Sequence, residues 1–366
     1  MTATVDEAST AQYEVVPERD PDRGWRPPGL FQLRPEALAA RAAVVLGITG
    51  LILAYILTSQ PFRSDNLSAG VVVALGALSL NVLVGYSGQI SLGHQAFIGI
   101  GAFISAYVIS ETHQSFYVGV GAAVAVGAIQ AVVLGLIALR VRGLYFGLVT
   151  LGWGFVAENS LFRLRSFTGG GEGRPAPRPG GFQSDRMYLL LCCIALAVIL
   201  LVDWRLVATK AGRAMQALRE SPQVAANYGV NVRGYTLLSF AVSGFYAGLA
   251  GALSASRALS ASPADYTFVL IALPYLIVTV VGGLRRRGGI VVFAVLFAIS
   301  GGYLKEWALD IFGAGWLAEN AAFLVQALSG LLAILTLIFQ PDGVGTITAP
   351  IGRWLKGERF RLHGDS

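Results

Sequence analysis

Charged side chains are scarce in this sequence. Asp, Glu, Lys and Arg make up 13% of the 366 residues, whereas hydrophobic residues make up 55%. A soluble globular domain carries about twice that charged fraction. The composition therefore excludes an ordinary soluble domain and predicts an all-α protein that crosses a membrane several times.

Cysteine, histidine and lysine are also rare, and each shortage excludes a kind of chemistry. Cys192 and Cys193 are neighbours inside one apolar run, which is not the pattern of a disulfide framework. The three histidines stand far apart without ligand-like companions, so no metal site is expected. None of Lys210, Lys305 and Lys356 follows a glycine, so the chain lacks a phosphate-binding P-loop and is not expected to hydrolyse ATP itself.

Ionisable groups are nearly missing from the interiors of the apolar runs. Ion-driven carriers usually bury such groups in mid-membrane, where they carry the coupling. Nor do histidines, cysteines and carboxylates cluster as a catalytic site requires. The sequence predicts no enzyme and no cofactor, and energy for active transport has to come from another subunit. An ion- or proton-driven secondary carrier, or a channel for a small solute, remains the alternative.

Long apolar runs are the main positive feature. A helix of about 20 residues spans the hydrocarbon core, and the runs predict about ten transmembrane helices. They cover 42–59, 67–85, 93–110, 117–139, 144–160, 187–205, 235–256, 266–283, 289–308 and 319–340. Residues 41–345 are thus one predicted transmembrane domain. The mixed-charge segment 1–40 is predicted to be a disordered cytoplasmic tail and not a signal peptide, and 346–366 a second cytoplasmic tail.

Basic residues are distributed unevenly between the two sides. With the amino terminus inside, 19 of the 27 Lys and Arg residues fall on inner segments, where basic residues are usually in excess. This predicts both termini in the cytoplasm. The outer loop 159–186 runs against the rule because it holds five arginines. Anionic lipid and this bias explain the net charge of +6, so no nucleic acid partner is expected.

The stretch GYSGQISLGHQ at 85–95 interrupts two apolar runs. Its glycines permit a broken or re-entrant segment, which persists at membrane depth only where protein or a water-filled cavity surrounds it. The functional interpretation is a polar lining for a pathway, and the alternative is a tight turn with wet side chains. The candidate pathway residues are Ser87, Gly88, Gln89, Ser91, Gly93, His94 and Gln95.

The basic loop 205–235 separates two strong spans. Ser221 followed by Pro222 predicts a helix start, Gly229 predicts its end, and a further helix is predicted over 213–220. Such a segment can lie on lipid or enter a partner's groove.

Two further motifs suggest packing and anchoring. Gly244, Gly248 and Gly251 have the spacing of closely packed helices. The triple arginine 285–287 is interpreted as an anchor to anionic lipid.

The string LNVLVGYSGQISLGHQAFIGIGAFISAYV at 80–108 resembles the signature of the branched-chain amino acid ABC transporter permeases, the LivH and LivM family. VRGLYFGLVTLGWG, SPADYTFVLIAL, VVGGL and IFQPDGVGT follow in family order and resemble the LivM branch. The segment TGGGEG at 168–173 departs from the family's usual Thr-Gly-Gly-Pro-Asn-Gly. The resemblance implies an ABC importer permease fold, with residues 85–95 near the translocation path.

The basic loop shares this resemblance. GRAMQALRESPQVAANYGVNV is similar to the EAA-type loop through which ATPase subunits act on ABC permeases. The matching positions are Gly212, Arg213, Arg219, Glu220, Ala225, Ala226 and Gly229.

The resemblance implies a permease subunit of an ATP-driven importer in the bacterial plasma membrane. The substrates it implies are branched-chain or other hydrophobic amino acids, or related small solutes. The implied partners are a LivH-like permease, two cytoplasmic ATP-binding subunits that use the ATP, an extracytoplasmic substrate-binding protein, and membrane lipid.

Overall fold

The computed structural model describes residues 58, 61–141, 143–312 and 331, and all elements below lie in that part of the chain. The α-helices are α2 Pro61–Asn81, α3 His94–Glu111, α4 Phe116–Ala138, α5 Leu144–Asn159, α6 Arg165–Thr168, α7 Asp185–Ala208, α8 Lys210–Glu220, α9 Pro222–Asn227, α10 Val232–Arg257, α11 Leu273–Gly282 and α12 Arg287–Phe312. Short 3₁₀ or π segments are η2 Val82–Tyr86, η3 Leu161–Arg163, η4 Gly170–Glu172, η5 Pro263–Asp265 and η6 Phe268–Ala272. Two strands, β1 Arg174–Pro175 and β2 Ser260–Ala261, pair antiparallel.

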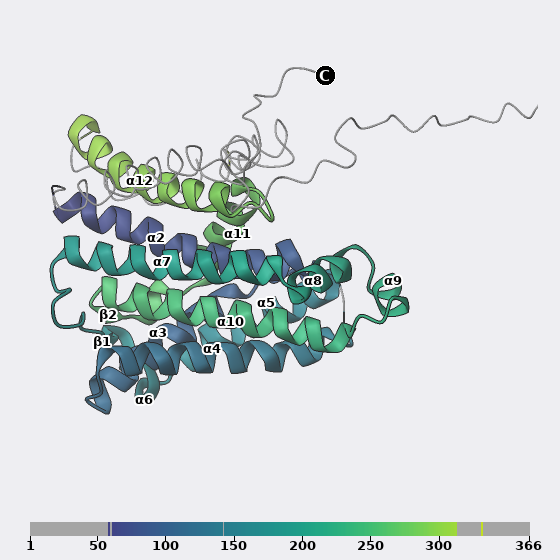
Figure 1. Cartoon of the computed structure of the whole chain (residues 1–366). Helices are drawn as coiled ribbons and strands as arrows, with labels where there is room; N and C mark the ends of the chain where they lie inside the picture. Colours follow the sequence, from purple (N-terminus) through teal and green to yellow (C-terminus); the bar gives the residue numbers. More distant parts are fainter. Residues whose placement is uncertain (1–57, 59–60, 142, 313–330, 332–366) are drawn as a thin grey trace, which may run out of the picture.

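The long helices lie side by side (Figure 1), and the spans formed by α2 and α10 are more buried than those formed by α4 and α7. Helix α10 packs against α4, α3 and α2, while α2 also packs against α12, α7 and α11. At one end of the bundle α8 and α9 project, and α6 and the two strands lie at the other end. Because η2 contacts α8, the stretch at 85–95 begins at the same end of the bundle as the basic loop.

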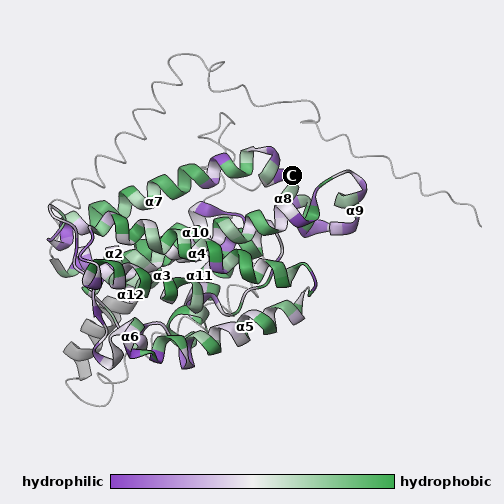
Figure 2. Ribbon diagram, turned by 90° about the horizontal axis from the view of Figure 1, so that it is seen from below, coloured by the Kyte–Doolittle hydropathy of each residue, from purple (hydrophilic) through white to green (hydrophobic). Residues whose placement is uncertain are grey.

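Helices occupy eight of the ten predicted spans, which confirms the all-α architecture. Apart from residues 58 and 331, the runs 42–59 and 319–340 and both tails lie outside the described residues, so the total of ten stays a prediction. Within the described part, four helices are long and apolar enough to cross a membrane. They are Phe62–Tyr86, Phe116–Ala138, Asp185–Ala208 and Val232–Arg257. Figure 2 shows hydrophobic residues along α4, α7 and α10 and hydrophilic residues around α9.

Glycines let α4 and α10 approach closely, as the sequence predicts. A Cβ added at Gly244 would lie 2.2 Å from the carbonyl oxygen of Gly127, and one at Gly248 would lie 2.4 Å from that of Ala123. Neither distance is possible for a real side-chain carbon, so glycine is required at both positions.

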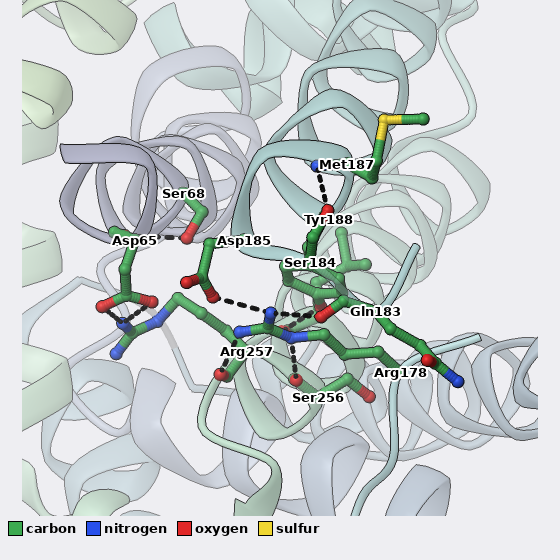
Figure 3. A network of polar contacts seen from close by, with 11 residues as sticks. Asp65, Ser68, Arg178, Gln183, Ser184, Asp185, Met187, Tyr188, Ser256 and Arg257 are labelled. Carbon is green, nitrogen blue, oxygen red and sulfur yellow. Dashed lines mark hydrogen bonds and ion pairs between the residues drawn. The ribbon is translucent and has the colours of Figure 1, made fainter. Parts of the chain in front are cut away.

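At the end opposite α9, Arg178 joins three segments (Figure 3). Its guanidinium donates to the carbonyl oxygens of Ser256 and Arg257 at the end of α10, at 3.3 and 3.1 Å. It also pairs with Asp185 at the start of α7, at 2.8 Å. The last carbonyls of a helix lack intrahelical partners, so Arg178 acts as a cap. Arg257 in turn pairs with Asp65 of α2 at 2.8 Å.

A second arginine of the same loop is also held by protein groups. Arg174 donates through Nε to the carbonyl oxygen of Phe167 at 2.7 Å and pairs with Glu111 at the end of α3. Two of the five arginines that run against the predicted charge asymmetry therefore have structural partners.

Candidate functional site

The predicted break in the helix is present. Helix α2 passes into the π-helix η2, and the backbone is irregular from Ser87 to Gly93 before α3 begins. Gly88 has φ of +69°, a value that favours glycine. π segments inside helices often occur at functional sites, so the break is the first part of the candidate site.

The polar side chains of the break are mostly buried. Ser87, Ser91, His94 and Gln95 are each at most 2% exposed. Gly88 and Ile90 are exposed, and Gln89 and Leu92 are half-buried. A wet turn therefore describes the tip of the segment but not its four buried polar residues.

Two of these residues have structural hydrogen bonds. The hydroxyl of Ser87 donates to the carbonyl oxygen of Leu83 at 2.9 Å. His94 Nε2 lies 2.8 Å from Ser79 Oγ, which also donates to the carbonyl oxygen of Ser243 at 2.8 Å. His94 thus ties the start of α3 to α2 and α10.

Ser91 and Gln95 have no such partners. Ser91 Oγ and both side-chain polar atoms of Gln95 are buried without a hydrogen bond among the described residues. The Gln95 amide faces α5, because a Cβ added at Gly154 would lie 2.4 Å from its Nε2. Leaving a buried polar group unpaired costs about 1–3 kcal/mol. Such a group calls for a functional explanation, so Gln95 is the strongest candidate for a ligand contact.

Helix α5 closes over the break, a role that sequence reasoning missed. The Leu92 amide donates to Thr150 Oγ1 at 3.0 Å. A Cβ added at Gly93 would lie 1.7 Å from the carbonyl oxygen of Thr150. The indole nitrogen of Trp153 on α5 is also buried without a partner. The small residues of GLVTLGWG were a signal for this contact, since they allow a backbone to approach.

The predicted local structure of the basic loop is confirmed. Ser221 caps α9 by accepting a hydrogen bond from the Val224 amide at 3.3 Å, and Pro222 occupies the first turn. Gly229 has φ of +78° and follows the end of the helix. The preceding helix, α8, begins at Lys210, one turn earlier than predicted.

One side of α8 packs on the bundle. Met215 and Leu218 are buried, whereas Val224 and Tyr228 at and after α9 are 52% and 84% exposed. Gly212 allows close contact, because an added Cβ would lie 2.4 Å from the carbonyl oxygen of Leu206. Of the motif positions in the loop, Gly212 and Ala225 are buried, Arg219 is half-buried, and Arg213, Glu220, Ala226 and Gly229 are exposed.

The structure brings the basic loop and the helix break into contact through Arg219. Its Nη1 donates to the carbonyl oxygen of Gly85. Arg285 donates to the same oxygen through Nε, at 3.2 Å. Burial and the neighbouring charge of Arg285 lower the pKa of Arg219, while Glu220 opposes this shift.

Two residues of the triple arginine have protein partners, while the predicted anchoring to lipid stays a prediction. The Arg285 amide donates to Asn81 Oδ1 at 2.9 Å, and Arg287 pairs with Asp203 of α7. The Tyr86 hydroxyl also donates to Asp203, at 2.7 Å. Asp203 is 1% exposed, and sequence reasoning missed it; a lone carboxylate in an apolar run of a chain with a triple arginine was the available signal.

Comparison with known proteins identifies the family. The permease component of branched-chain amino acid transport systems matches residues 63–341. The chain belongs to this family. As the sequence resemblance indicated, it is a transport permease and an integral membrane protein, and its relatives are not enzymes.

Curated relatives place the permease near the LivM branch. It is 30% identical over 308 residues to the high-affinity branched-chain amino acid transport system permease protein LivM of Escherichia coli, covering 76% of this chain and 69% of that protein. The LivM protein of Salmonella typhimurium matches with the same identity and coverage. A probable branched-chain amino acid transport permease protein LivH of Methanocaldococcus jannaschii is 26% identical, covering 82% of this chain and 88% of that protein. No solved structure matches the permease.

Proposed function

We propose that this chain is a LivM-type permease subunit of an ATP-driven ABC importer for branched-chain or other hydrophobic amino acids, or related small solutes. A LivH-like permease completes the translocation path, two cytoplasmic ATP-binding subunits supply the energy, and an extracytoplasmic binding protein delivers the substrate. Both termini face the cytoplasm. The family match and the names of the relatives support this proposal.

The exposed face of the α8–α9 module carries the proposal. Val224 within the capped helix α9 and Tyr228 directly after it are exposed, and α9 projects beyond the ends of the long helices (Figure 1). An aromatic and an aliphatic side chain presented together suit a groove on a partner protein. Their position beyond the apolar helix surfaces favours a cytoplasmic partner over lipid, and we assign that partner to the ATP-binding subunits.

The buried amide of Gln95 supports a substrate path between α3 and α5. Its Oε1 and Nε2 have no hydrogen-bond partner within the part of the chain that the structure describes, so it can accept a hydrogen bond and donate one. An amino acid zwitterion offers the matching ammonium donor and carboxylate acceptor. In the described state Gly154 of α5 lies against the amide, so substrate entry requires α5 to move away from α3.

Co-purification of matched tyrosine variants tests the docking face. Tyr228→Ser removes the exposed ring beside α9, and we expect retention of the ATP-binding subunits to fall at least tenfold, since aromatic anchors at interfaces contribute about 2 kcal/mol or more. Tyr117→Ser removes an exposed ring from the opposite end of the bundle, where Tyr117 is 61% exposed, and serves as the control. The second permease should remain with both variants.

Equal retention of the ATP-binding subunits by the two variants would contradict the docking assignment. Substrate uptake by the isolated chain without nucleotide would instead support the secondary carrier or channel.

A further inference from the structure

Arg219 is the side chain through which the α8–α9 module contacts the break in the helix. We propose that Arg219 is a positioning residue that transmits movement of the basic loop 205–235 to residues 85–95, and this inference rests on the proposed function. It acts as a rigid link, so that a displacement of α8 displaces the start of the pathway segment. The contacts of Arg219 with the helix break and the contacts of α8 with the bundle support this role.

The head of Arg219 binds a carbonyl group that the break leaves without a backbone partner. Gly85 lies in the last turn of η2. Among the described residues, no backbone amide that follows η2 donates to the Gly85 carbonyl oxygen. The Arg219 guanidinium supplies one donor to this oxygen and Arg285 supplies a second through Nε, at 3.2 Å, as basic side chains do at helix ends. Displacing Arg219 would weaken this buried cap, which makes the contact sensitive to the position of α8.

The stem of Arg219 makes a second contact, with Gly88. A Cβ added at Gly88 would lie 2.9 Å from Cγ, 3.3 Å from Cα and 3.4 Å from Cβ of Arg219. Because Arg219 is held both at its guanidinium and along its aliphatic carbons, the side chain cannot rotate freely. These two contacts fix α8 relative to the end of η2 and to the turn that follows it.

On the α8 side, the link is joined to a packed helix. Met215 and Leu218 lie in the same helix and are buried, and Gly212 packs against the end of α7. Arg219 therefore moves with α8 as a body. A force applied to α9 by a partner reaches Arg219 through one short turn at Ser221.

On the pathway side, contacts continue from the turn to α5. Leu92 and Gly93, a few residues beyond Gly88, pack on Thr150, and Gln95 follows against Gly154. A contiguous set of packed groups can carry coupling between distant sites. Here it connects the exposed docking face to the unpaired amide of Gln95.

Single substitutions give the first part of the test. The complete transporter is reconstituted in liposomes, and uptake of leucine is measured per ATP hydrolysed. Arg219→Ala should lower this ratio at least tenfold. Lys210→Ala removes the same charge about 13 Å along the same helix and should retain the wild-type ratio. The amount of purified complex shows whether each variant assembles.

A disulfide in place of the arginine gives the second part. The Cβ separation of 3.4 Å between positions 88 and 219 is close to the 3.5–4.5 Å typical of disulfides. Gly88→Cys with Arg219→Cys, in a chain where Cys192 and Cys193 are alanine, should be uncoupled when reduced. Oxidation should restore coupling because the covalent bond replaces the guanidinium link. Arg219→Cys alone should stay uncoupled under both conditions.

The outcomes separate this inference from the proposed function. A wild-type ratio in Arg219→Ala or in the reduced double variant would overturn the link, and so would a block of uptake on oxidation, because the contact would then have to open during transport. Failure of the wild-type complex to use ATP for uptake of any amino acid or amide would instead overturn the importer itself, and the link with it.

Discussion

At the scale of single residues, His94 and Gln95 are neighbours with the same burial and different surroundings. Both are 0% exposed. His94 hydrogen-bonds Ser79, whereas the amide of Gln95 has no partner among the described residues. Burial alone therefore does not separate the two residues, but their hydrogen bonds do: Nε2 of His94 is paired, while its Nδ1 and both polar atoms of Gln95 have no partner among the described residues.

Leucine substitutions at these two positions should differ in their effects on protein stability and on substrate uptake. His94→Leu removes a buried hydrogen bond, so the free energy of unfolding should fall by about 1 kcal/mol. Gln95→Leu removes an unpaired amide, so stability should not fall, while uptake should drop at least tenfold through loss of a substrate contact. Thermal unfolding in detergent and uptake in liposomes measure the two effects. Wild-type uptake in Gln95→Leu would contradict the pathway role.

Several residues were predictable from sequence because their roles are local. The cap at Ser221 and the positive φ of Gly229 follow from backbone chemistry within a few positions. Asp203 and Arg287 were not predictable as a pair, because they are 84 residues apart and only tertiary packing brings them together. The same holds for Arg219 and Gly85, which are 134 residues apart.

At the scale of elements, the contact between α4 and α10 depends on backbone approach. Gly127, Gly244 and Gly248 bring the two helices together without intervening side chains. In membranes, where lipid is as apolar as leucine, such close packing is a main source of helix association. The sequence predicted the small face of α10 from its spacing, but it did not indicate which helix would lie against it.

Alanine substitutions should distinguish a packed glycine from an open one. At Gly244 the new methyl group would meet the Gly127 carbonyl oxygen at 2.2 Å, and overpacking should lower the free energy of unfolding by about 2 kcal/mol. Gly121 lies in α4 with no atom within 4 Å of an added Cβ. Gly121→Ala should raise stability by about 0.5 kcal/mol through helix propensity. Similar values for both variants in detergent unfolding would contradict the predicted packing.

At the scale of the whole molecule, the bundle has two chemically different ends. One end is fastened by Arg174 and Arg178, which cap and pair with groups of the bundle. The other combines the helix break with the projecting α8–α9 module. The ordered family motifs were enough to predict the permease class, whereas the closure of the break by α5 emerged only from the packing around Thr150.

The most direct test of the account is ATP-dependent uptake. The chain is purified with its partner subunits, reconstituted in liposomes, and supplied with a binding protein and a panel of amino acids and small amides. The account predicts uptake that requires both ATP and the binding protein, with branched-chain or other hydrophobic amino acids among the substrates. Uptake by the isolated chain without nucleotide would contradict it.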